Sequence, residues 1–235
     1  MNKLFEEFSP VSKAEWKEKI QTDLKGADYN EKLIAKFEGI EIDSICHHSN
    51  SPQNNPINST KDWDIYQLID GTDAKKANQL ALKALNNGAT ALCIENPNDL
   101  PLLFKDILIE HIRVDFKNYS ADTPPKFKEF IDNRKLHKEL VQGAFHGNES
   151  GSLPNFYYQS IEANGNTAEA QIKNALLKGK DTKNKNTQFI FEIGSNYFLE
   201  IAKLRAFRIL WNNVSNINPY IFAQTTLSNK EDDFP

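Results

Sequence analysis

The sequence has little cysteine and no long apolar run. Only Cys46 and Cys93 are cysteines, and neither lies in a CxxC spacing, so nothing points to a disulfide framework, although two cysteines could pair. No stretch approaches the roughly 20 apolar residues that cross a bilayer. The N-terminal run MNKLFEEFSPVSKAEW has early acids and no apolar core, which is unlike a signal peptide. These absences predict a cytoplasmic protein without a membrane partner.

Basic patches are also missing. The formal net charge is -4, and no basic stretch is long enough to follow a phosphate backbone, which argues against a nucleic-acid partner. The motifs GxGxxG, GxxxxGK[ST], GxSxG and HExxH are absent. Hydrophobic residues nevertheless make up 39% of the 235 residues, including 15 Phe, which is enough for a substantial globular core.

Residues 1–60 have the pattern of an N-terminal arm. Ser12 and Glu15 fit a capping box that opens a helix, which Gly26 would end. Apolar residues then alternate around Phe37 and Ile40, which predicts a strand or hairpin. A polar segment rich in Asn and Pro follows at 47–62. We expect this arm to contact another subunit.

From Trp63 onward, strand and helix patterns alternate. The predicted strands are 63–70, 89–95, 111–116, 140–147, 155–162, 187–194 and 219–227, and the predicted helices are 73–88, 98–108, 124–139, 167–179 and 195–214. This alternation predicts an α/β fold with a parallel sheet and right-handed crossovers. After the strand at 140–147 only NESGSLP stands where a helix would belong. That connection is too short for an ordinary crossover, so either this strand is wrong or the chain is locally degenerate.

The number of strands bears on the fold class. A closed (β/α)8 barrel typically needs about 250 residues, and residues 61–235 supply about seven strands. The sequence therefore predicts an incomplete TIM-type (β/α)8-like barrel. A missing strand leaves an open edge, which a partner chain would cover unless the chain is a truncated form of a longer protein.

The segment 191–214 is the most informative. Its apolar residues lie nearly all around the helix, which predicts burial over most of its surface. Glu200 and Lys203 are spaced to form an i,i+3 pair. Arg205 falls among apolar neighbours such as Phe198 and Ile201, so we expect it to need an acidic or carbonyl partner.

The run EIGSNYFLEIAKLRAFRILW, residues 192–211, resembles the "xxGxNFFxEIAKLRAxRxLW" segment of the methylmalonyl-CoA mutase family. The run FSPVSKAEWKEKIQTDLKGADYNEKL, residues 8–33, resembles the arm of that family, FEGIEI its "xEGIxxxP" strand, and WDIYQLID with residues 77–95 its first barrel units. Within this motif we assign packing roles rather than catalytic ones to Glu200, Lys203, Arg205, Arg208 and Trp211.

The resemblance implies a fold and a chemistry. Family members bind acyl-CoA along the axis of a TIM-type barrel, and a separate flavodoxin-like domain presses adenosylcobalamin onto it. The cofactor starts a radical isomerisation of methylmalonyl-CoA to succinyl-CoA, while the protein positions and shields it.

This sequence lacks the family's catalytic parts. It contains no DxHxxG motif, whose His ligates cobalt, so we expect no cobalamin-binding domain. Aligned on Gly165 and Thr167, the catalytic His of the family falls on Ser160. The resemblance therefore implies a small, non-catalytic subunit that stabilises a catalytic large subunit in a heterodimer. Adenosylcobalamin would be bound by that partner, this chain alone would be inactive, and acyl-CoA is a doubtful ligand of it.

Two alternatives stay open. One is a free-standing TIM-barrel enzyme acting on a small carboxylate or phosphate, with strand-end acids as its candidate cluster: Glu95, Asp115, Glu162 and Glu192. The other is an inactive truncated fragment. The Cys46-His47-His48 run suggests a metal site, but three adjacent residues converge poorly on one ion, so we interpret it as a polar loop.

Overall fold

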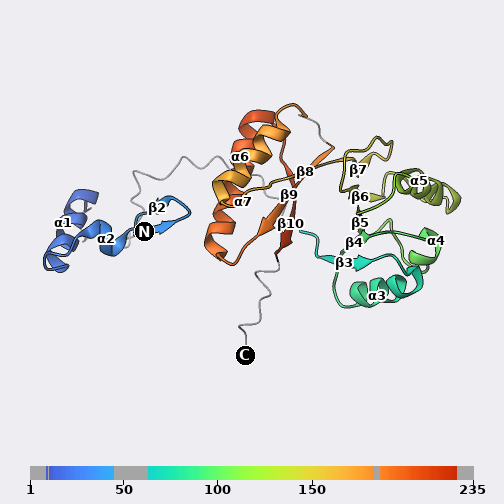
Figure 1. Cartoon of the computed structure of the whole chain (residues 1–235), viewed down its shortest axis with the longest axis horizontal. Helices are drawn as coiled ribbons and strands as arrows, with labels where there is room; N and C mark the ends of the chain where they lie inside the picture. Colours follow the sequence, from blue (N-terminus) through green and yellow to red (C-terminus); the bar gives the residue numbers. More distant parts are fainter. Residues whose placement is uncertain (1–8, 10, 45–62, 183–185, 227–235) are drawn as a thin grey trace, which may run out of the picture. The chain divides into compact units, whose positions relative to one another are not determined.

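The computed structural model describes residues 9, 11–44, 63–182 and 186–226, so the Cys46 to His48 segment lies outside the described residues. The chain divides into two compact units, residues 1–56 and 57–235. Each unit is described separately (Figure 1).

The first unit contains two short helices and a hairpin. Helix α1 (Lys13–Asp23) begins at Ser12, whose side chain caps the helix and whose backbone N–H bonds the Glu15 carboxylate at 2.8 Å. This confirms the predicted capping box. After α2 (Tyr29–Leu33), strands β1 (Ala35–Phe37) and β2 (Ile40–Ile42) pair antiparallel. Their turn residues Glu38 and Gly39 both have positive φ, as a tight hairpin turn requires.

This unit has very little core. Tyr29 is buried beneath Trp16, with ring centroids 6.5 Å apart, and its hydroxyl bonds Asp43. No residue of α1 is buried, and the apolar side chains of Phe37, Ile40 and Ile42 are all exposed. An element with so few buried contacts gains little stability from its own packing.

A five-stranded parallel sheet opens the second unit. Its strands, in both chain and spatial order, are β3 (Tyr66–Asp70), β4 (Ala91–Glu95), β5 (Arg113–Lys117), β6 (Gln142–Phe145) and β7 (Asn155–Tyr157). Helices α3 (Ala74–Asn86), α4 (Leu100–Leu103) and α5 (Thr123–Asn133) connect them. The predicted helix 98–108 is thus a single turn, capped by Asp99.

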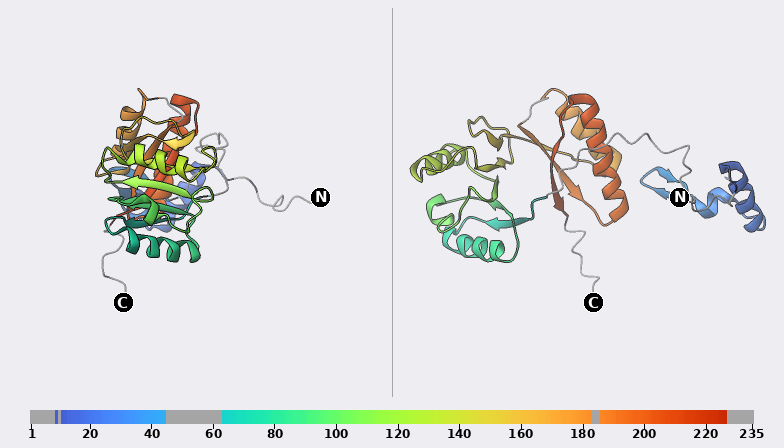
Figure 2. Two further views of the ribbon diagram at one scale, coloured as in Figure 1. Left: turned by 90° about the vertical axis from the view of Figure 1, so that its right-hand side faces the viewer. Right: turned by 180° about the vertical axis from the view of Figure 1, so that it is seen from behind.

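A three-stranded parallel sheet follows, in the order β10-β9-β8. It consists of β8 (Gln159–Glu162), β9 (Thr187–Ile193) and β10 (Tyr220–Thr225), connected by α6 (Ala168–Gly179) and α7 (Tyr197–Ser215). In both views of this unit, α6 and α7 cover one side of this sheet, while α3, α4 and α5 lie beyond the five-stranded sheet (Figures 1 and 2). The two sheets therefore lie between two layers of helices.

The two sheets together hold one strand more than the predicted seven, because the predicted strand 155–162 is broken. β7 joins the first sheet and β8 the second, and Tyr158 between them is buried. Its hydroxyl accepts a hydrogen bond from the backbone N–H of Leu153 at 2.9 Å. A side chain fixed in the core thus lies at the point where the chain passes from the first sheet to the second.

The strand at 140–147 is confirmed despite its missing helix. β6 pairs with β7 in parallel, with Gln142 opposite Asn155, and residues 146–154 connect them without a helix. Gly143 also allows β6 to lie close to β5, because a Cβ at this position would be 1.8 Å from the carbonyl oxygen of Val114. The locally degenerate alternative is therefore the one that the structure supports.

Strand alternation separates two kinds of surface in this unit. On β5, Val114 and Phe116 point into the aromatic core under the helices, which also contains Phe127 and Phe145. A second core lies between the three-stranded sheet and its helices, where the Phe189 ring is 4.7 Å from Trp211. The other face of each sheet carries polar and aromatic side chains. None of the described helices is both long and apolar enough to cross a bilayer.

Candidate functional site

The faces of the two sheets that lie opposite each other share a buried polar network. Because side chains alternate along a strand, Arg113 and Asp115 of β5 lie on the face away from Val114 and Phe116. Asp115 is fully buried. Its carboxylate accepts a hydrogen bond from the Tyr66 hydroxyl at 3.1 Å and lies 2.9 Å from Nε2 of His146. Strands β3 and β5 and the segment after β6 thus converge on one acid.

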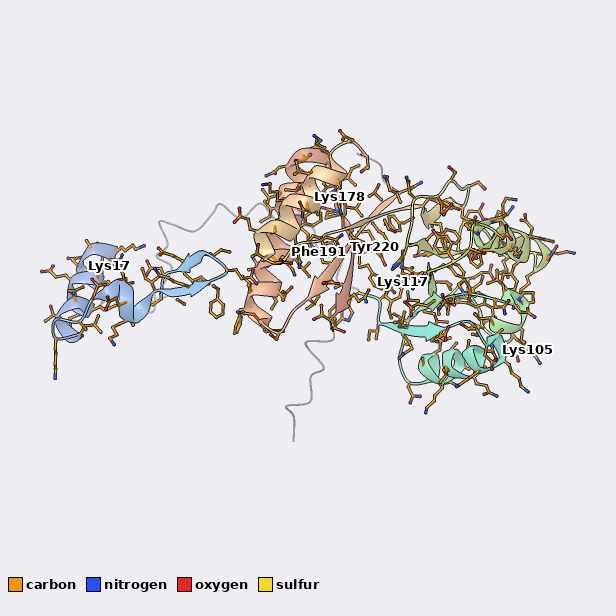
Figure 3. The ribbon with its side chains drawn as sticks, viewed as in Figure 1. Lys17, Lys105, Lys117, Lys178, Phe191 and Tyr220 are labelled. Atoms are coloured by element: carbon orange, nitrogen blue, oxygen red, sulfur yellow. The ribbon has the colours of Figure 1, made fainter. Side chains whose placement is uncertain are left out.

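Strand β10 completes this network. The hydroxyls of Tyr66 and Tyr220 are 2.9 Å apart, and the Phe222 ring contacts both Tyr66 and His146, with centroid distances of 4.9 and 4.8 Å. Figure 3 shows Tyr220 of β10 on the side of the three-stranded sheet that faces the five-stranded sheet. Phe191 of β9 lies on the other side, under the helices. The inter-sheet network, as we name it, consists of Tyr66, Arg113, Asp115, His146, Tyr157, Tyr220 and Phe222.

Arg113 supplies the positive charge of the network. Its Nε donates to the Tyr66 hydroxyl at 3.2 Å and lies 3.5 Å from the Asp64 carboxylate. Its guanidinium lies 4.4 Å from the ring centre of Tyr220, which in turn stacks on Tyr157 at 4.6 Å. A desolvated cation over aromatic faces is a strong contact. Arg113 therefore joins the two sheets as well as balancing the buried acid.

Burial governs the proton equilibria of these groups. It raises the pKa of the Tyr66 hydroxyl far above its ordinary value of 10, and the neighbouring Asp115 carboxylate raises it further. Burial likewise raises the pKa of Tyr220 and, on the neighbouring strand, of the Cys93 thiol. These hydroxyls and this thiol are held in their neutral forms at physiological pH. They serve as hydrogen-bonding groups here rather than as nucleophiles.

Three buried polar atoms in this region lack a hydrogen-bond partner among the described residues: Nη2 of Arg113, Nδ1 of His146 and Oε1 of Gln188. The His146 side chain is only 3% exposed, and the ring of Phe222 packs against it. An acid, an imidazole and a phenol in contact could pass a proton between them. Close packing by aromatic rings nevertheless leaves these groups little contact with solvent.

Ser160 occupies a defined place beside this network. Its hydroxyl donates to the backbone carbonyl of Phe145 at 2.8 Å and accepts from the Gln188 side chain, also at 2.8 Å. The hydroxyl hydrogen is thus already bonded to the main chain, so Ser160 ties the end of β6 to β8 and β9.

Glu200 and Lys203 form the ion pair that their i,i+3 spacing predicted. Lys203 is 3% exposed. Its ammonium group also donates to the Glu192 carbonyl at 2.7 Å and to the Gln171 side chain at 2.8 Å. A buried ammonium with three oxygen partners is satisfied, and it fastens α7 to the end of β9 and to α6.

The other motif residues lie on different sides of α7. Trp211 is 2% exposed and packs on Phe189. Arg208 is partly buried, and this burial lowers the pKa of its guanidinium. Arg205 is exposed, and the structure records no hydrogen bond or ion pair for it within the described part of the chain. Arg205 is not buried among the described residues, so the prediction that a buried Arg205 needs an acidic or carbonyl partner stays a prediction.

The predicted burial of the helix is wrong as well. Only Lys203, Phe207 and Trp211 of α7 are buried. Tyr197 and Phe198 are 71% and 81% exposed, and apolar side chains extend along the outer side. The all-round apolar pattern is real, but the described residues of the second unit cover only one side of the helix.

The four strand-end acids of the enzyme alternative have different surroundings. Asp115 belongs to the inter-sheet network, whereas Glu95 pairs with Lys117 at 3.4 Å. Glu162 and Glu192 are exposed. Among the described residues, no three His, Cys, Asp or Glu side chains are grouped so that they could hold a metal ion.

Sequence reasoning singled out Asp115 but missed its partners. The alternation in HIRVDF places Arg113 and Asp115 on one face, opposite Val114 and Phe116, and this charged pair inside an apolar strand is a usable signal. The partners Tyr66, His146 and Tyr220 lie far away in the chain, and no local pattern connects them.

The fold and this network define an α/β protein with parallel sheets whose facing sides are joined by buried aromatic and charged groups. A family model described as "Methylmalonyl-CoA mutase" matches residues 166–220, which span α6, β9 and α7. The methylmalonyl-CoA mutase small subunit of Porphyromonas gingivalis is 30% identical over 278 aligned positions. That alignment covers 90% of this chain and 45% of the relative, so the chain spans about half the relative's length. The chain belongs to the methylmalonyl-CoA mutase family.

Proposed function

We propose that this chain acts as the small, non-catalytic subunit of an adenosylcobalamin-dependent acyl-CoA mutase and stabilises a catalytic large subunit in a heterodimer. The heterodimer would isomerise methylmalonyl-CoA to succinyl-CoA. The main support is the similarity to a protein named as a small subunit along nearly the whole chain. Ser160, at the position of the family's catalytic His, supports the non-catalytic assignment because its hydroxyl is committed to the Phe145 carbonyl.

The two sheets support a TIM-type barrel as the proposed architecture, incomplete in that its eight strands are divided between two separate sheets. Parallel strands with helices on the outside are its building units. The contacts of Tyr66 on edge strand β3 with Tyr220 and Phe222 on edge strand β10 bring the first and last strands of the unit close together. In this proposal the inter-sheet network lies on the barrel axis.

A filled axis argues against acyl-CoA binding by this chain. In the proposed barrel, stacked Tyr157 and Tyr220, with Arg113 over them, would fill the axis along which the family binds its substrate. Displacing them would expose buried charge and aromatic surface, which is costly. We therefore propose that the acyl-CoA is held by the large subunit.

Cobalamin does not fit the histidines of the described residues. His146 is buried, bonded to Asp115 and covered by Phe222, so its Nε2 is unavailable to a metal. His111 and His137 are exposed, and neither lies in the family's DxHxxG motif. We propose that the cofactor belongs to the partner subunit, and we assign no step of its chemistry to this chain.

The N-terminal unit supports a partner-binding role for the arm. Its exposed Phe37, Ile40 and Ile42 and its very small core leave apolar surface that a second subunit would cover. We propose that residues 1–60 contact the large subunit.

Co-expression with the large subunit tests this function. We expect a 1:1 complex on size-exclusion chromatography, and mutase turnover only when the large subunit is present. The partner should also raise the melting temperature of this chain by mass action. If the two chains elute separately and neither melting temperature changes, the small-subunit assignment is wrong.

A further inference from the structure

Helix α7 carries an apolar stripe on the side opposite its core contacts. With 3.6 residues per turn, Lys203, Phe207 and Trp211 face the sheet. The opposite side presents the residues that we call the outer stripe: Phe198, Ile201, Ala202, Arg205 and Ile209. All five are exposed, with Phe198 at 81%, Ile201 at 39% and Ile209 at 38%.

This stripe differs from scattered surface hydrophobes. Single exposed apolar residues are normal on a soluble protein, but a continuous apolar row over three helical turns is typical of an interaction surface. The same helix is well anchored on its other side by the Lys203 contacts and by Trp211. The stripe is thus a firm, preformed surface.

Arg205 lies near the middle of the outer stripe and indicates what covers it. Within the described residues its guanidinium has no recorded ion pair, and Glu200, the acid of the same helix, pairs with Lys203 on the opposite side. Covering the stripe with a purely apolar surface would bury this charge without a partner, which is very costly. The covering surface therefore needs hydrogen-bond acceptors opposite Arg205, and a carboxylate is the acceptor that also neutralises its charge.

A second copy of this chain is a poor occupant. In a two-fold symmetric contact, the residues near the axis meet their own copies. If the two outer stripes overlapped fully, the two Arg205 side chains would lie within about one turn of each other in either a parallel or an antiparallel pair. Like charges brought together in a desolvated contact oppose association, so the charge pattern favours a different chain.

We propose that the outer stripe is the docking surface for an apolar helical segment of the large subunit that carries an Asp or Glu opposite Arg205. This inference rests on the proposed heterodimer and adds which face of α7 makes the contact. Phe198 and Ile209 supply the apolar ends of the contact, and Arg205 sets its register. A bidentate guanidinium–carboxylate pair is well suited to fix register.

Charge reversal at Arg205 tests the proposal in the complex with the large subunit. We expect Arg205→Glu to weaken binding by about a hundredfold or more, and Phe198→Ala by roughly tenfold. The matched control is Lys173→Glu, which reverses an exposed charge in the middle of the neighbouring helix α6 and should bind like wild type. Circular dichroism of each variant alone should be unchanged, because Arg205 holds no recorded contact within the described chain.

A photo-crosslinking residue at position 198 identifies the occupant without changing any charge. We expect crosslinks to the large subunit, next to an acidic residue. Crosslinks to a second copy, or only within this chain, would overturn the docking proposal even if the heterodimer forms. So would wild-type affinity of Arg205→Glu. Failure of the wild-type chain to bind the large subunit would overturn the proposed function itself, and the docking proposal with it.

Discussion

The Asp115 carboxylate and the His146 imidazole are in contact in the middle of the second unit, with Oδ2 and Nε2 2.9 Å apart. Asp115 is fully buried, and the His146 side chain is 3% exposed. A buried acid of this kind is tolerated only when its oxygens are bonded, and here Tyr66 bonds the second oxygen. The hydrogen bonds of this pair and of Tyr66 therefore hold β3, β5 and the segment after β6 together at one point.

Removing the acid should leave its partners unsatisfied. We expect Asp115→Ala to lower the free energy of unfolding by about 2–4 kcal/mol, because His146 would lose its buried partner and Arg113 would lose the buried acid that balances its charge. Urea unfolding followed by near-UV circular dichroism measures this change. Glu162→Ala, at an exposed strand-end acid, is the matched control and should change stability by less than about 0.5 kcal/mol. Equal effects of the two substitutions would contradict a structural role for the network.

Alkaline pH should destabilise the second unit through its buried tyrosines. The pKa of Tyr66 is raised in the folded state, so its stabilising contribution is complete below the ordinary value of 10 and falls as the pH rises above it. Each such group removes about 1.4 kcal/mol per pH unit in that range. We expect Tyr66→Phe to show a smaller loss of stability between about pH 9 and 11 than wild type.

The control for this pH effect is Tyr197→Phe, which alters an exposed tyrosine. Its unfolding free energy should follow the wild-type pH dependence. If Tyr66→Phe also follows the wild-type curve, the Tyr66 hydroxyl is not protected in the folded protein.

Lys203 should be important for stability although it is charged. We expect Lys203→Met to lower the free energy of unfolding by about 2–4 kcal/mol, since Glu200 would remain partly buried without its cation. The double variant with Glu200→Gln should recover part of this loss. Lys173→Met, on an exposed part of α6, should be nearly neutral. A loss that is additive in the double variant would argue against direct coupling of Glu200 and Lys203.

Trp211 should contribute through packing alone. Its ring packs against both Phe189 and Phe207, and we expect Trp211→Ala to lower the free energy of unfolding by about 3–5 kcal/mol through the cavity that remains. Trp63→Ala is the comparison, because Trp63 is 80% exposed. Thermal unfolding of both variants measures the difference. Similar melting temperatures would mean that α7 is not held by this contact.

The amino-acid sequence by itself determined the features that depend on near neighbours. The capping box of Ser12 and Glu15, the alternation of β5 and the Glu200–Lys203 pair follow from spacings of two to four residues, which secondary structure converts directly into contacts. The parallel α/β class followed from the order of such segments. The family motif in α7 could be recognised in the sequence because it is one continuous run of residues.

Only the tertiary structure decided which surfaces are covered. Tyr66 and Tyr220 meet across most of the length of the second unit, and no local pattern encodes that distance. The apolar pattern of α7 predicted burial all around, yet the described residues of the second unit cover one side and leave Arg205 and Phe198 exposed. Tyr158, where the chain passes from β7 to β8, likewise packs on Phe145 of β6, a contact that no local pattern encodes. Hydrophobic patterning reports that a surface favours contact, whereas the partner for that contact is set by the packing of distant segments.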